Sequence, residues 1–291
     1  MIKEIVSMKK MMKGNRYTPS NYPEEVEKKA QELKRRGYRM PSKKILRTPE
    51  QLKGIREACN INTGVLDYVA AHIHEGMSTQ EIDLLVYEYT SNHDAIPATL
   101  NFDGFPKSVC TSINEVVCHG IPSKDEILQN GDIVNVDVST IYKGFYGDAS
   151  RMFMIGDVSL EMQKLVKVTK ECMEIGIKTA QPWAQLGDVG AAIQEHAEKN
   201  GYSVVRDLCG HGCGVEFHED PDVEHFGKKG TGMVLVPGMT FTIEPMINMG
   251  AYDVFIDEDD DWTVCTEDGL PSAQWENLIL ITDTGNEILS Y

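Results

Sequence analysis

Two halves of the chain repeat one pattern, and this repeat limits the fold more than any other feature of the sequence. Helix-like stretches near residues 55 and 165 are each followed by a second helix start, which the capping box from Ser78 to Glu81 predicts in the first half and Asp188, as an N-cap, in the second. A strand-rich part then follows, at 130–157 in the first half and at 236–283 in the second. Helices combined with strand-rich parts in this way predict an α/β (α+β) fold. The repeat predicts a pseudo-twofold duplication inside it.

Each strand-rich part carries two carboxylates in an apolar setting. Asp137 in the first half matches Glu244 in the second, and Asp148 matches Glu276. Acidic residues are almost never fully buried without a partner, because an unpaired charge is costly to remove from water. Simple alternation toward solvent explains one or two such acids. Four at matching places indicate a shared source of positive charge, for which bound metal is the economical choice.

The stretch GHGCGVEFHEDP (210–221) adds two histidines, His211 and His218, seven residues apart. This spacing excludes an HExxH zinc helix, in which the histidines are four apart, and no GK[ST] follows that would indicate a phosphate loop. The glycines beside His211 favour close backbone approach in a loop or at the start of a strand. Cys209 and Cys213, which flank His211, are interpreted as small buried hydrophobic residues.

Carboxylate and imidazole groups are ligands for hard or borderline divalent ions. Four carboxylates and one histidine can hold two ions, with two carboxylates bridging them. Two metals about 3.5–4 Å apart can activate a shared water. The acids outnumber any clustered cysteines, so the pattern does not indicate a thiolate-rich zinc centre. The sequence therefore predicts a site for two divalent metal ions.

Six segments, taken together and in order, resemble the type 1 methionine aminopeptidases, a family with the pita-bread fold. The resemblance covers residues 48–291, which we expect to form the catalytic domain. It implies removal of the N-terminal methionine from nascent polypeptides and peptides, with a preference for a small second residue. The segments that carry it are KSVCTSINEVVCHGIP (107–122), VNVDVS (134–139), FYGDASR (145–151), GHGCGVEFHEDP (210–221), FTIEPM (241–246) and SAQWEN (272–277).

The resemblance assigns a role to each metal ligand. It implies that Asp137 binds one ion and that Asp148 and Glu276 bridge the pair. His211 and Glu244 complete the second ion, and Glu244 also relays the proton of the attacking water. The two divalent ions stay open among Co, Mn, Fe, Zn and Ni, because the affinity order of these metals does not name the physiological one.

The resemblance also implies two catalytic histidines and a methionine pocket. His119 would hydrogen-bond the substrate near the scissile amide, and His218 would contact the scissile carbonyl. From the residues alone, each is more often structural, and the other histidines are interpreted as surface or packing residues. Phe102 and Phe105 stand where tyrosine is common in the family, and Thr99 where cysteine is common. The pocket residues, which without the resemblance would be assigned to core packing, are Thr99, Phe102, Phe105, Cys110, Phe217 and Trp262.

Two further features concern positive charge. Asn114, Val116 and Ser272 match a loop that binds a monovalent cation in some relatives, which predicts one such cation here. The acidic run DEDDD (257–261) precedes Trp262 and is interpreted as a solvated hairpin turn. Attraction of the positively charged amino terminus of substrates is the alternative for this run.

The first 47 residues are predicted to form a basic extension and linker. Residues 1–50 carry 14 Lys and Arg against 6 Asp and Glu, whereas the whole chain carries 28 against 45. A basic arm on an acidic body indicates contact with something anionic, such as the ribosome, or a solubilising tail. Pro23 is expected to begin a helix that Gly37 closes, and 38–47 is expected to be a linker.

Composition limits the compartments in which the protein is expected to act. No apolar run approaches the 18 residues of a membrane helix, and the amino terminus lacks the apolar core of a signal peptide. Seven cysteines without a CxxC pair fit reduced thiols in the cytoplasm better than a disulfide framework. We expect a cytoplasmic protein, without a membrane partner, that acts on polypeptides starting with Met. The family habit predicts a monomer.

Two other functions remain open at this point. A proline-specific aminopeptidase shares the fold and the metal ligands, although such enzymes usually carry a large amino-terminal domain. A module that has lost its metals and binds RNA or ribosomes is the second alternative. It is disfavoured because all five ligand positions are intact.

Overall fold

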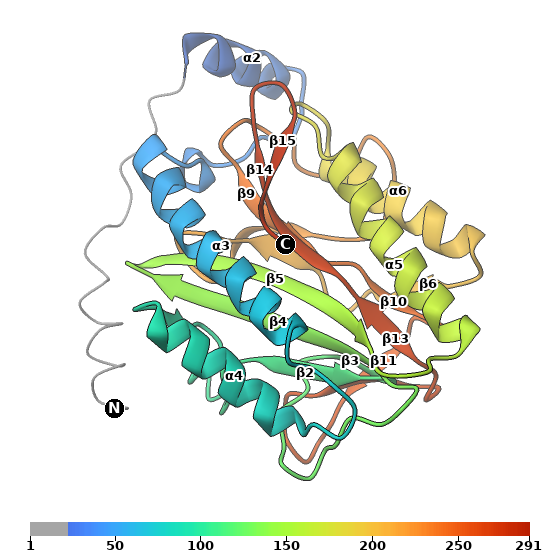
Figure 1. Ribbon diagram of the computed structural model, residues 1–291. Helices are drawn as coiled ribbons and strands as arrows, with labels where there is room; N and C mark the ends of the chain where they lie inside the picture. Colours follow the sequence, from blue (N-terminus) through green and yellow to red (C-terminus); the bar gives the residue numbers. More distant parts are fainter. Residues whose placement is uncertain (1–22) are drawn as a thin grey trace.

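The computed structural model describes residues 23–291, and the first 22 residues lie outside the described part of the chain (Figure 1). The predicted basic extension is therefore described only from residue 23 onward. The helices, in chain order, are α2 (Glu24–Arg35), the short 3-10 helix η2 (Lys43–Ile45), α3 (Pro49–Ala70), α4 (Thr79–Asn92), α5 (Leu160–Thr179) and α6 (Leu186–Lys199). Within residues 23–291, no helix has the length and apolar character that a membrane crossing requires.

Local capping explains where the helices begin. Thr48 and Ser78 precede α3 and α4, and each accepts a hydrogen bond from the backbone N–H three residues on, in a capping box. The box between Ser78 and Glu81 confirms the prediction. The predicted start of α6 at Asp188 was wrong, because Asp188 lies inside the first turn. Its carboxylate accepts the N–H of Gln185 at 2.8 Å, which satisfies a donor that a helix end leaves free.

The strands occupy the parts of the chain where the sequence predicts them. The predicted part 130–157 contains β4 and β5, and the part 236–283 contains β9 to β14. The strands of the described residues are β1 (Ile96–Pro97), β2 (Cys110–Ile113), β3 (Val116–Cys118), β4 (Ile133–Tyr142), β5 (Phe145–Met154), β6 (Ser203–Val204), β7 (Gly210–Gly212), β8 (Glu219–Val223), β9 (Thr240–Ile243), β10 (Met246–Asn248), β11 (Val254–Ile256), β12 (Val264–Thr266), β13 (Ser272–Gln274), β14 (Glu276–Ile281) and β15 (Asn286–Ser290).

One sheet, with nine strands counted over residues 23–291, forms the centre of the molecule. Its main order is β1-β4-β5-β14-β9-β7-β8, with β2 beside β4 and β15 beside β14. The hairpin β4–β5 of the first half meets β14 and β9 of the second half, where Glu276 of β14 lies opposite Ser150 of β5. The order β4-β5-β14-β9 therefore has a pseudo-twofold axis between β5 and β14, as the sequence repeat predicts.

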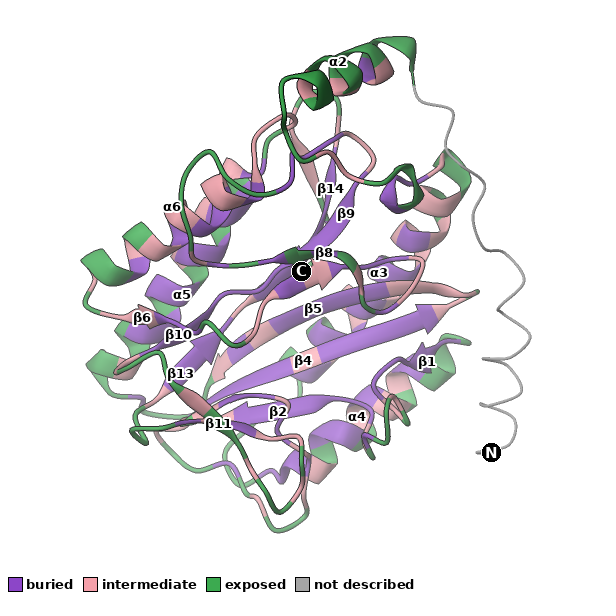
Figure 2. Cartoon of the chain, turned by 180° about the vertical axis from the view of Figure 1, so that it is seen from behind, coloured by how far each residue is buried: buried purple, intermediate pink, exposed green. Residues whose placement is uncertain are grey.

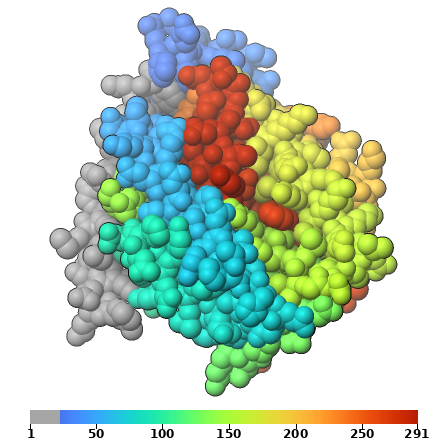
Figure 3. Space-filling view, in the orientation of Figure 1, coloured from blue at the N-terminus to red at the C-terminus, as the bar shows by residue number. Residues whose placement is uncertain are grey.

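Helices α3 to α6 cover one face of the sheet (Figure 1). Helices α3 and α4 lie over the first half and α5 and α6 over the second, and the carboxyl-terminal strands emerge between them in red (Figure 3). Val136 and Val138 of β4 pack in one core cluster with Leu66 of α3. Asp137 lies between these valines in sequence and so belongs to the opposite face of the strand. Figure 2, turned by 180°, shows that face in front of the helices.

Helix α2 begins after Pro23 and closes at Gly37, as the sequence predicts. Gly37 has a φ of +90°, which glycine adopts without a steric penalty. The N–H groups of Gly37 and Tyr38 donate to the carbonyls of Lys34 and Leu33, in a Schellman closure. Acidic residues in the first turn and basic residues in the last turn suit the helix dipole.

The segment 38–47 differs from the expected linker because it packs against the body. Ile45 and Leu46 are buried in the core cluster that also contains residues of α5, α6 and β9. Leu46 pairs with Met239 in an isolated bridge, and Arg47 is buried. Apolar side chains in this short connection fill the edge of a core whose other members lie far away in sequence. The domain division at residue 47 stays a prediction.

Candidate metal centre and substrate cavity

A cavity of about 360 Å³ lies on the open face of the sheet. It brings together every residue that the sequence predicts to hold a divalent metal, act in catalysis or contact the methionine side chain. The predicted residues along its wall are Thr99, Phe102, Phe105, Cys110, His119, Asp137, Asp148, His211, Phe217, His218, Glu244, Trp262 and Glu276. The convergence of these side chains is a property of the fold, and their individual roles stay predictions.

Four adjacent strands supply the carboxylates. Asp137 belongs to β4, Asp148 to β5 and Glu276 to β14, while Glu244 directly follows β9. Because these strands are neighbours in the sheet, the two halves place their acids side by side. Ligand oxygens of Asp137, Asp148 and Glu276 lie within 4.8 Å of one another. The symmetric acids of the sequence thus form one cluster.

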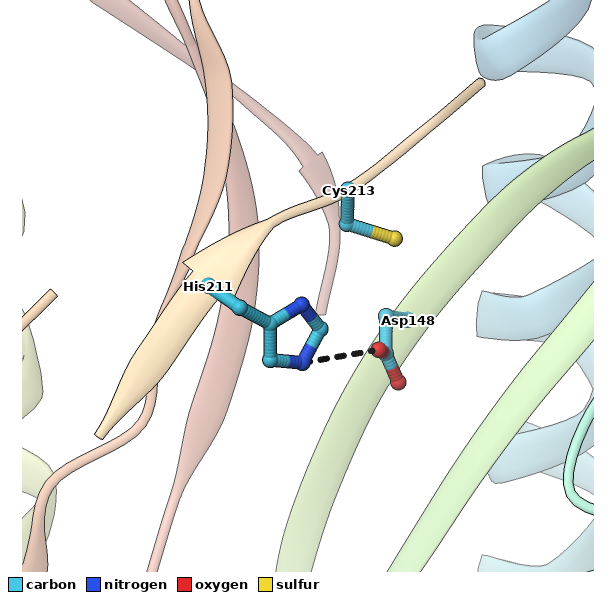
Figure 4. Close-up of side chains that lie close together, drawn as sticks. All are labelled: Asp148, His211 and Cys213. Atoms are coloured by element: carbon cyan, nitrogen blue, oxygen red, sulfur yellow. Dashed lines mark ion pairs between the residues drawn. The ribbon is translucent and has the colours of Figure 1, made fainter. Parts of the chain in front are cut away.

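His211 lies in β7 and forms a second group with Glu244 and Glu276, again within 4.8 Å. Its Nε2 atom is 3.6 Å from Oε1 of Glu244 and 3.7 Å from Oδ2 of Asp148 (Figure 4). Cys213 lies beside His211 and Asp148, but its thiol is fully buried, and burial raises its pKa well above the ordinary value. A protonated, buried thiol packs as a small hydrophobic group.

The cluster holds protons that exposed carboxylates would lose. Burial raises the pKa of Asp137 to about 7 and that of Glu244 to about 8. Burial and the neighbouring carboxylates raise the pKa values of Asp148 and Glu276 well above their ordinary range. Burial lowers the pKa of His211 to about 3, so its imidazole is neutral near neutral pH. The site therefore lacks the positive charge that four neighbouring carboxylates require.

The donor set fits divalent metal ions. Oδ1 of Asp137 is buried, and no hydrogen-bond partner for it exists among the described residues. Carboxylates and a neutral imidazole are ligands that hard and borderline divalent ions take. A bound cation would lower the carboxylate pKa values and satisfy the orphaned oxygen. Glu276 belongs to both groups of ligands, which agrees with a bridging position.

Three polar side chains that the sequence analysis missed orient the ligands. Ser139 Oγ donates to Oδ1 of Asp148 at 2.8 Å. Thr242 Oγ1 donates to one carboxylate oxygen of Glu244 at 2.6 Å, and Gln274 Nε2 donates to the other at 3.1 Å. Each of the three stands two positions from a metal-ligand candidate: Ser139 shares β4 with Asp137, Thr242 lies in β9 just before Glu244, and Gln274 ends β13 just before Glu276. That period of two is the signal that could have found them.

His225 also supports the site, although the sequence indicates only a surface or packing residue there. It is 1% exposed, and its Nε2 accepts the backbone N–H of Glu244 at 3.1 Å. Burial lowers its pKa to about 3, which keeps the accepting nitrogen unprotonated. His225 therefore holds the backbone of a metal-ligand candidate. Four other histidines do not line the cavity, namely His72, His74, His93 and His196.

Aromatic side chains form an apolar wall beside the carboxylates. Phe102 packs edge-on against Phe217 with ring centroids 4.9 Å apart, and Phe105 packs edge-on against Trp262 at 5.2 Å. The ring of His218 lies 4.3 Å from that of Phe217 and 5.2 Å from that of Phe102. The wall therefore continues from the apolar pocket to the predicted catalytic histidine.

His119 follows β3 in a left-handed conformation, with a φ of +59°. This conformation is uncommon outside glycine and persists where the surrounding structure fixes it. Gly120 is required next to it, because a Cβ atom there would collide with the carbonyl of Thr111. The His119 side chain lines the cavity beside Trp262, with ring centroids 6.2 Å apart, and burial lowers its pKa.

The other predicted positions do not line the cavity. Asn114 and Ser272 are neighbours, since the N–H of Ser272 donates to the Asn114 carbonyl at 2.8 Å, and Val116 begins β3. Monovalent cation binding there stays a prediction. The run 257–261 lies between β11 and β12 as a turn, as expected. Asp260 fixes this turn by accepting backbone N–H groups two and three residues on, each at 2.8 Å.

Comparison with known proteins gives close relatives. Residues 53–283 match the model of metallopeptidase family M24. Methionine aminopeptidase A from Synechocystis sp. is 49% identical over 240 residues, which cover 82% of this chain and 94% of that protein. The crystal structure of methionine aminopeptidase from Rickettsia prowazekii superposes with a TM-score of 0.83 at 47% identity, covering 84% of this chain and 99% of that one.

A more distant likeness shows the fold alone. Prolidase from Pyrococcus furiosus superposes with a TM-score of 0.66 at 22% identity, covering 85% of this chain and 65% of that one. The pita-bread fold and the resemblance to the methionine aminopeptidases are thus both confirmed. Because the family model spans most of the chain, the protein belongs to metallopeptidase family M24.

Proposed function

We propose that the protein removes the N-terminal methionine from peptides and nascent proteins, with two divalent metal ions and a preference for a small second residue. The cavity carries this proposal, because it joins five candidate metal ligands to an aromatic wall. The relatives named methionine aminopeptidase support the choice of substrate. The preference for a small second residue rests on the family resemblance.

The residues Asp137, Asp148, His211, Glu244 and Glu276 would hold the two ions. When bound, such ions lower the pKa of a shared water toward neutral and offset negative charge on the attacked carbonyl. The chain supplies ligands that the sheet fixes before substrate arrives, which limits reorganisation during the reaction. Co, Mn, Fe, Zn and Ni all suit this set of ligands.

The two histidines of the wall would contact the substrate itself. His119 donates a hydrogen bond near the scissile amide, and His218 donates to the scissile carbonyl. Burial lowers the pKa of both, that of His218 to about 4, so each is neutral near neutral pH. A neutral imidazole donates through one ring nitrogen and can accept through the other. Glu244 relays the proton of the attacking water.

The apolar side of the cavity would take the methionine side chain. An unbranched thioether fits such a wall, since contacts between sulfur and aromatic rings are favourable. Phe102 and Phe105 leave the rim without the hydroxyls common in the family, which keeps the pocket apolar. Thr99 and Cys110 line the same cavity, and Thr99 Oγ1 is buried with no partner among the described residues.

Further proposals concern partners and location. We propose that residues 1–47 contact the ribosome, that Asn114, Val116 and Ser272 hold a monovalent cation, and that a monomer acts in the cytoplasm. All seven cysteines are free thiols, which supports a reducing compartment. Deleting residues 1–22, which keeps the buried Ile45, Leu46 and Arg47, should weaken ribosome co-sedimentation in a salt-dependent way and leave peptide turnover unchanged. Unchanged co-sedimentation would contradict the proposed contact with the ribosome.

The function is tested by release of methionine from Met-Ala-Ser and of the first residue from Ala-Pro-Ala. Both are measured after chelation and after Co²⁺ or Mn²⁺ is restored, with Met-Phe-Ser as the control for the second residue. We expect metal-dependent cleavage of Met-Ala-Ser alone. Cleavage of Ala-Pro-Ala alone would identify a proline-specific enzyme, and no cleavage with metal bound would favour a binding module.

A further inference from the structure

A buried ion pair joins the amino-terminal segment to the loop that carries Phe217 and His218. Nη2 of Arg47 lies 2.5 Å from Oε1 of Glu219, and the two side chains are 0% and 7% exposed. Arg47 precedes residues 53–283, the region that matches the family model. Glu219 directly follows His218 in the chain. A segment outside the matched region therefore contacts the residue that follows His218.

Glu219 fixes one end of the loop 213–218, which connects β7 to β8. The Oε1 atom that receives Arg47 also accepts the backbone N–H groups of Val215 and Glu216, each at 3.3 Å. One carboxylate oxygen thus accepts hydrogen bonds from two loop amides and from a guanidinium. The path of the loop just before its cavity side chains depends on this oxygen.

Arg47 reaches the other end of the same loop through one intermediate. Its Nε donates to Oγ1 of Thr240 at 2.9 Å, and that hydroxyl donates to the carbonyl of Cys213 at 2.5 Å. The backbone N–H of Arg47 donates to the Gly238 carbonyl at 2.9 Å, which holds the arginine beside β9. Two donor nitrogens of one guanidinium, Nε and Nη2, therefore hold both ends of the loop 213–218 against the sheet.

Stability alone gives little reason for this pair. Arg47 Nη1 and Glu219 Oε2 are buried, and neither has a hydrogen-bond partner among the described residues. Removing two charges from water is costly, and well-packed apolar residues often stabilise a protein as well as a buried ion pair does. A partly satisfied pair is better explained by the geometry it imposes.

We infer that Arg47 is a positioning residue, which acts through Glu219 and Thr240 to hold Phe217 and His218 in the cavity. The inference rests on the proposed function, in which His218 contacts the substrate. Arg47 itself does not line the cavity, so its effect on the reaction must pass through the loop. Small misplacement of a side chain that contacts the reacting group is enough to slow catalysis strongly.

The test is a mutant cycle in the full-length protein with Arg47→Met, His218→Ala and the double variant. Metal content and kcat/KM on Met-Ala-Ser are measured with Mn²⁺ restored, below the Tm of each variant. We expect Arg47→Met to lower kcat/KM about 10- to 100-fold while metal content stays at the wild-type level. The double variant should be slower than His218→Ala by much less than the factor lost in Arg47→Met alone, because the two changes share the interaction made by His218 and only the placement of Phe217 is lost in addition.

Two controls separate positioning from general support of the fold. Arg47→Lys keeps a charge beside Glu219 but lacks the fork that also reaches Thr240, so it should be more active than Arg47→Met and less active than the wild type. Asn62→Ala removes a fully buried side chain that bridges Thr140 and Ser290, and should lower the Tm with kcat/KM unchanged. If Arg47→Met does not fold, Glu219→Gln replaces it in the same cycle, since the amide keeps the shape and an accepting oxygen.

The outcomes of the cycle are distinct. Wild-type kcat/KM in folded Arg47→Met would overturn the inference, and so would a double variant whose loss is the product of the two single losses. Parallel loss of metal and activity in Arg47→Met would also overturn it, because the arginine would then support the metal centre. Failure of the wild-type protein to release methionine would instead reject the proposed function.

Discussion

The two halves of the molecule contribute equally to the carboxylate cluster and unequally to the rest of the cavity. Each half provides one acid from an inner strand, β5 or β14, and one from the outer strand beside it. The connections differ: the first half supplies Phe105 and His119, and the second supplies His211 and His218. Strands common to both halves therefore supply the four carboxylates, while segments found in only one half add the metal-ligand candidate His211 and the residues of the proposed substrate pocket.

The largest effects are expected at the inner acids, which the duplication relates. Asp148→Asn and Glu276→Gln keep the shape of each side chain and remove its charge, so both should lose metal and activity together. Metal affinity should fall by more than the about 10- to 100-fold typical of residues that only orient a ligand. Metal analysis and Met-Ala-Ser turnover check this, with Asp67→Asn, which disrupts an ion pair to Arg151 outside the cavity, as the unaffected control.

The equivalence of the two halves would be contradicted if metal binding and activity depended on one inner acid and not on the other. Retention of both metal and activity in Asp148→Asn, with loss of both in Glu276→Gln, would mean that the halves are equivalent only in fold.

A smaller loss is expected at His119, which has no counterpart in the repeat. His119→Ala removes a proposed contact to the substrate and leaves the carboxylates in place. We expect kcat to fall about 10²- to 10³-fold, as for loss of one donor to a reacting carbonyl, with metal content unchanged. Single-turnover kinetics and metal analysis measure the two quantities. Loss of metal in this variant would show that the assignment of His119 is wrong.

The pH dependence of the free energy of unfolding tests whether carboxylates of both halves hold protons in the folded protein. In the metal-free protein, Asp137 and Glu244 have pKa values raised to about 7 and about 8, above their ordinary values near 4. Their folded forms keep protons that the unfolded chain releases, which lowers the free energy of unfolding as pH rises from about 4 to about 8. The buried histidines His211, His218 and His225 have lowered pKa values and oppose this trend below about pH 6.5, so the net fall should appear between about pH 7 and pH 8.

Metal binding displaces those protons and is favoured at high pH. The rise in Tm on adding Mn²⁺ should therefore be larger near pH 8 than near pH 6. A saturating ion that binds only the folded state contributes about 2.7 kcal/mol at one hundred times its Kd. Differential scanning fluorimetry at both pH values measures this, and an equal rise at both would contradict the assigned pKa shifts.

The smallest effect is expected at the acidic turn 257–261, which belongs to the second half alone. Asp259→Asn and Asp261→Asn should change KM for Met-Ala-Ser less than about twofold, because exposed charges are screened by solvent and salt. Titration of KM against NaCl checks this. A marked rise in KM with salt, abolished in both variants, would support the alternative that the turn attracts the amino terminus of substrates.

The sequence is most informative where chemistry and pattern coincide. Acids in apolar strands are costly to bury, so sequence positions alone predict that residues such as Asp137 and Glu276 share a site, and the structure brings their carboxylates together. Supporting contacts are harder to predict, because Ser139 resembles any small polar residue of a strand. The sequence places Arg47 in a linker, since nothing local indicates a partner that lies 172 residues away. Tertiary packing decides such cases.

The central claim is that carboxylates of both halves hold the metal on which methionine release depends. Its most direct test is a titration of the chelated, full-length protein with Mn²⁺ while release of methionine from Met-Ala-Ser is followed. Release should begin only as metal is taken up, and Asp148→Asn and Glu276→Gln should take up little. Full release by protein that holds no metal would contradict the account.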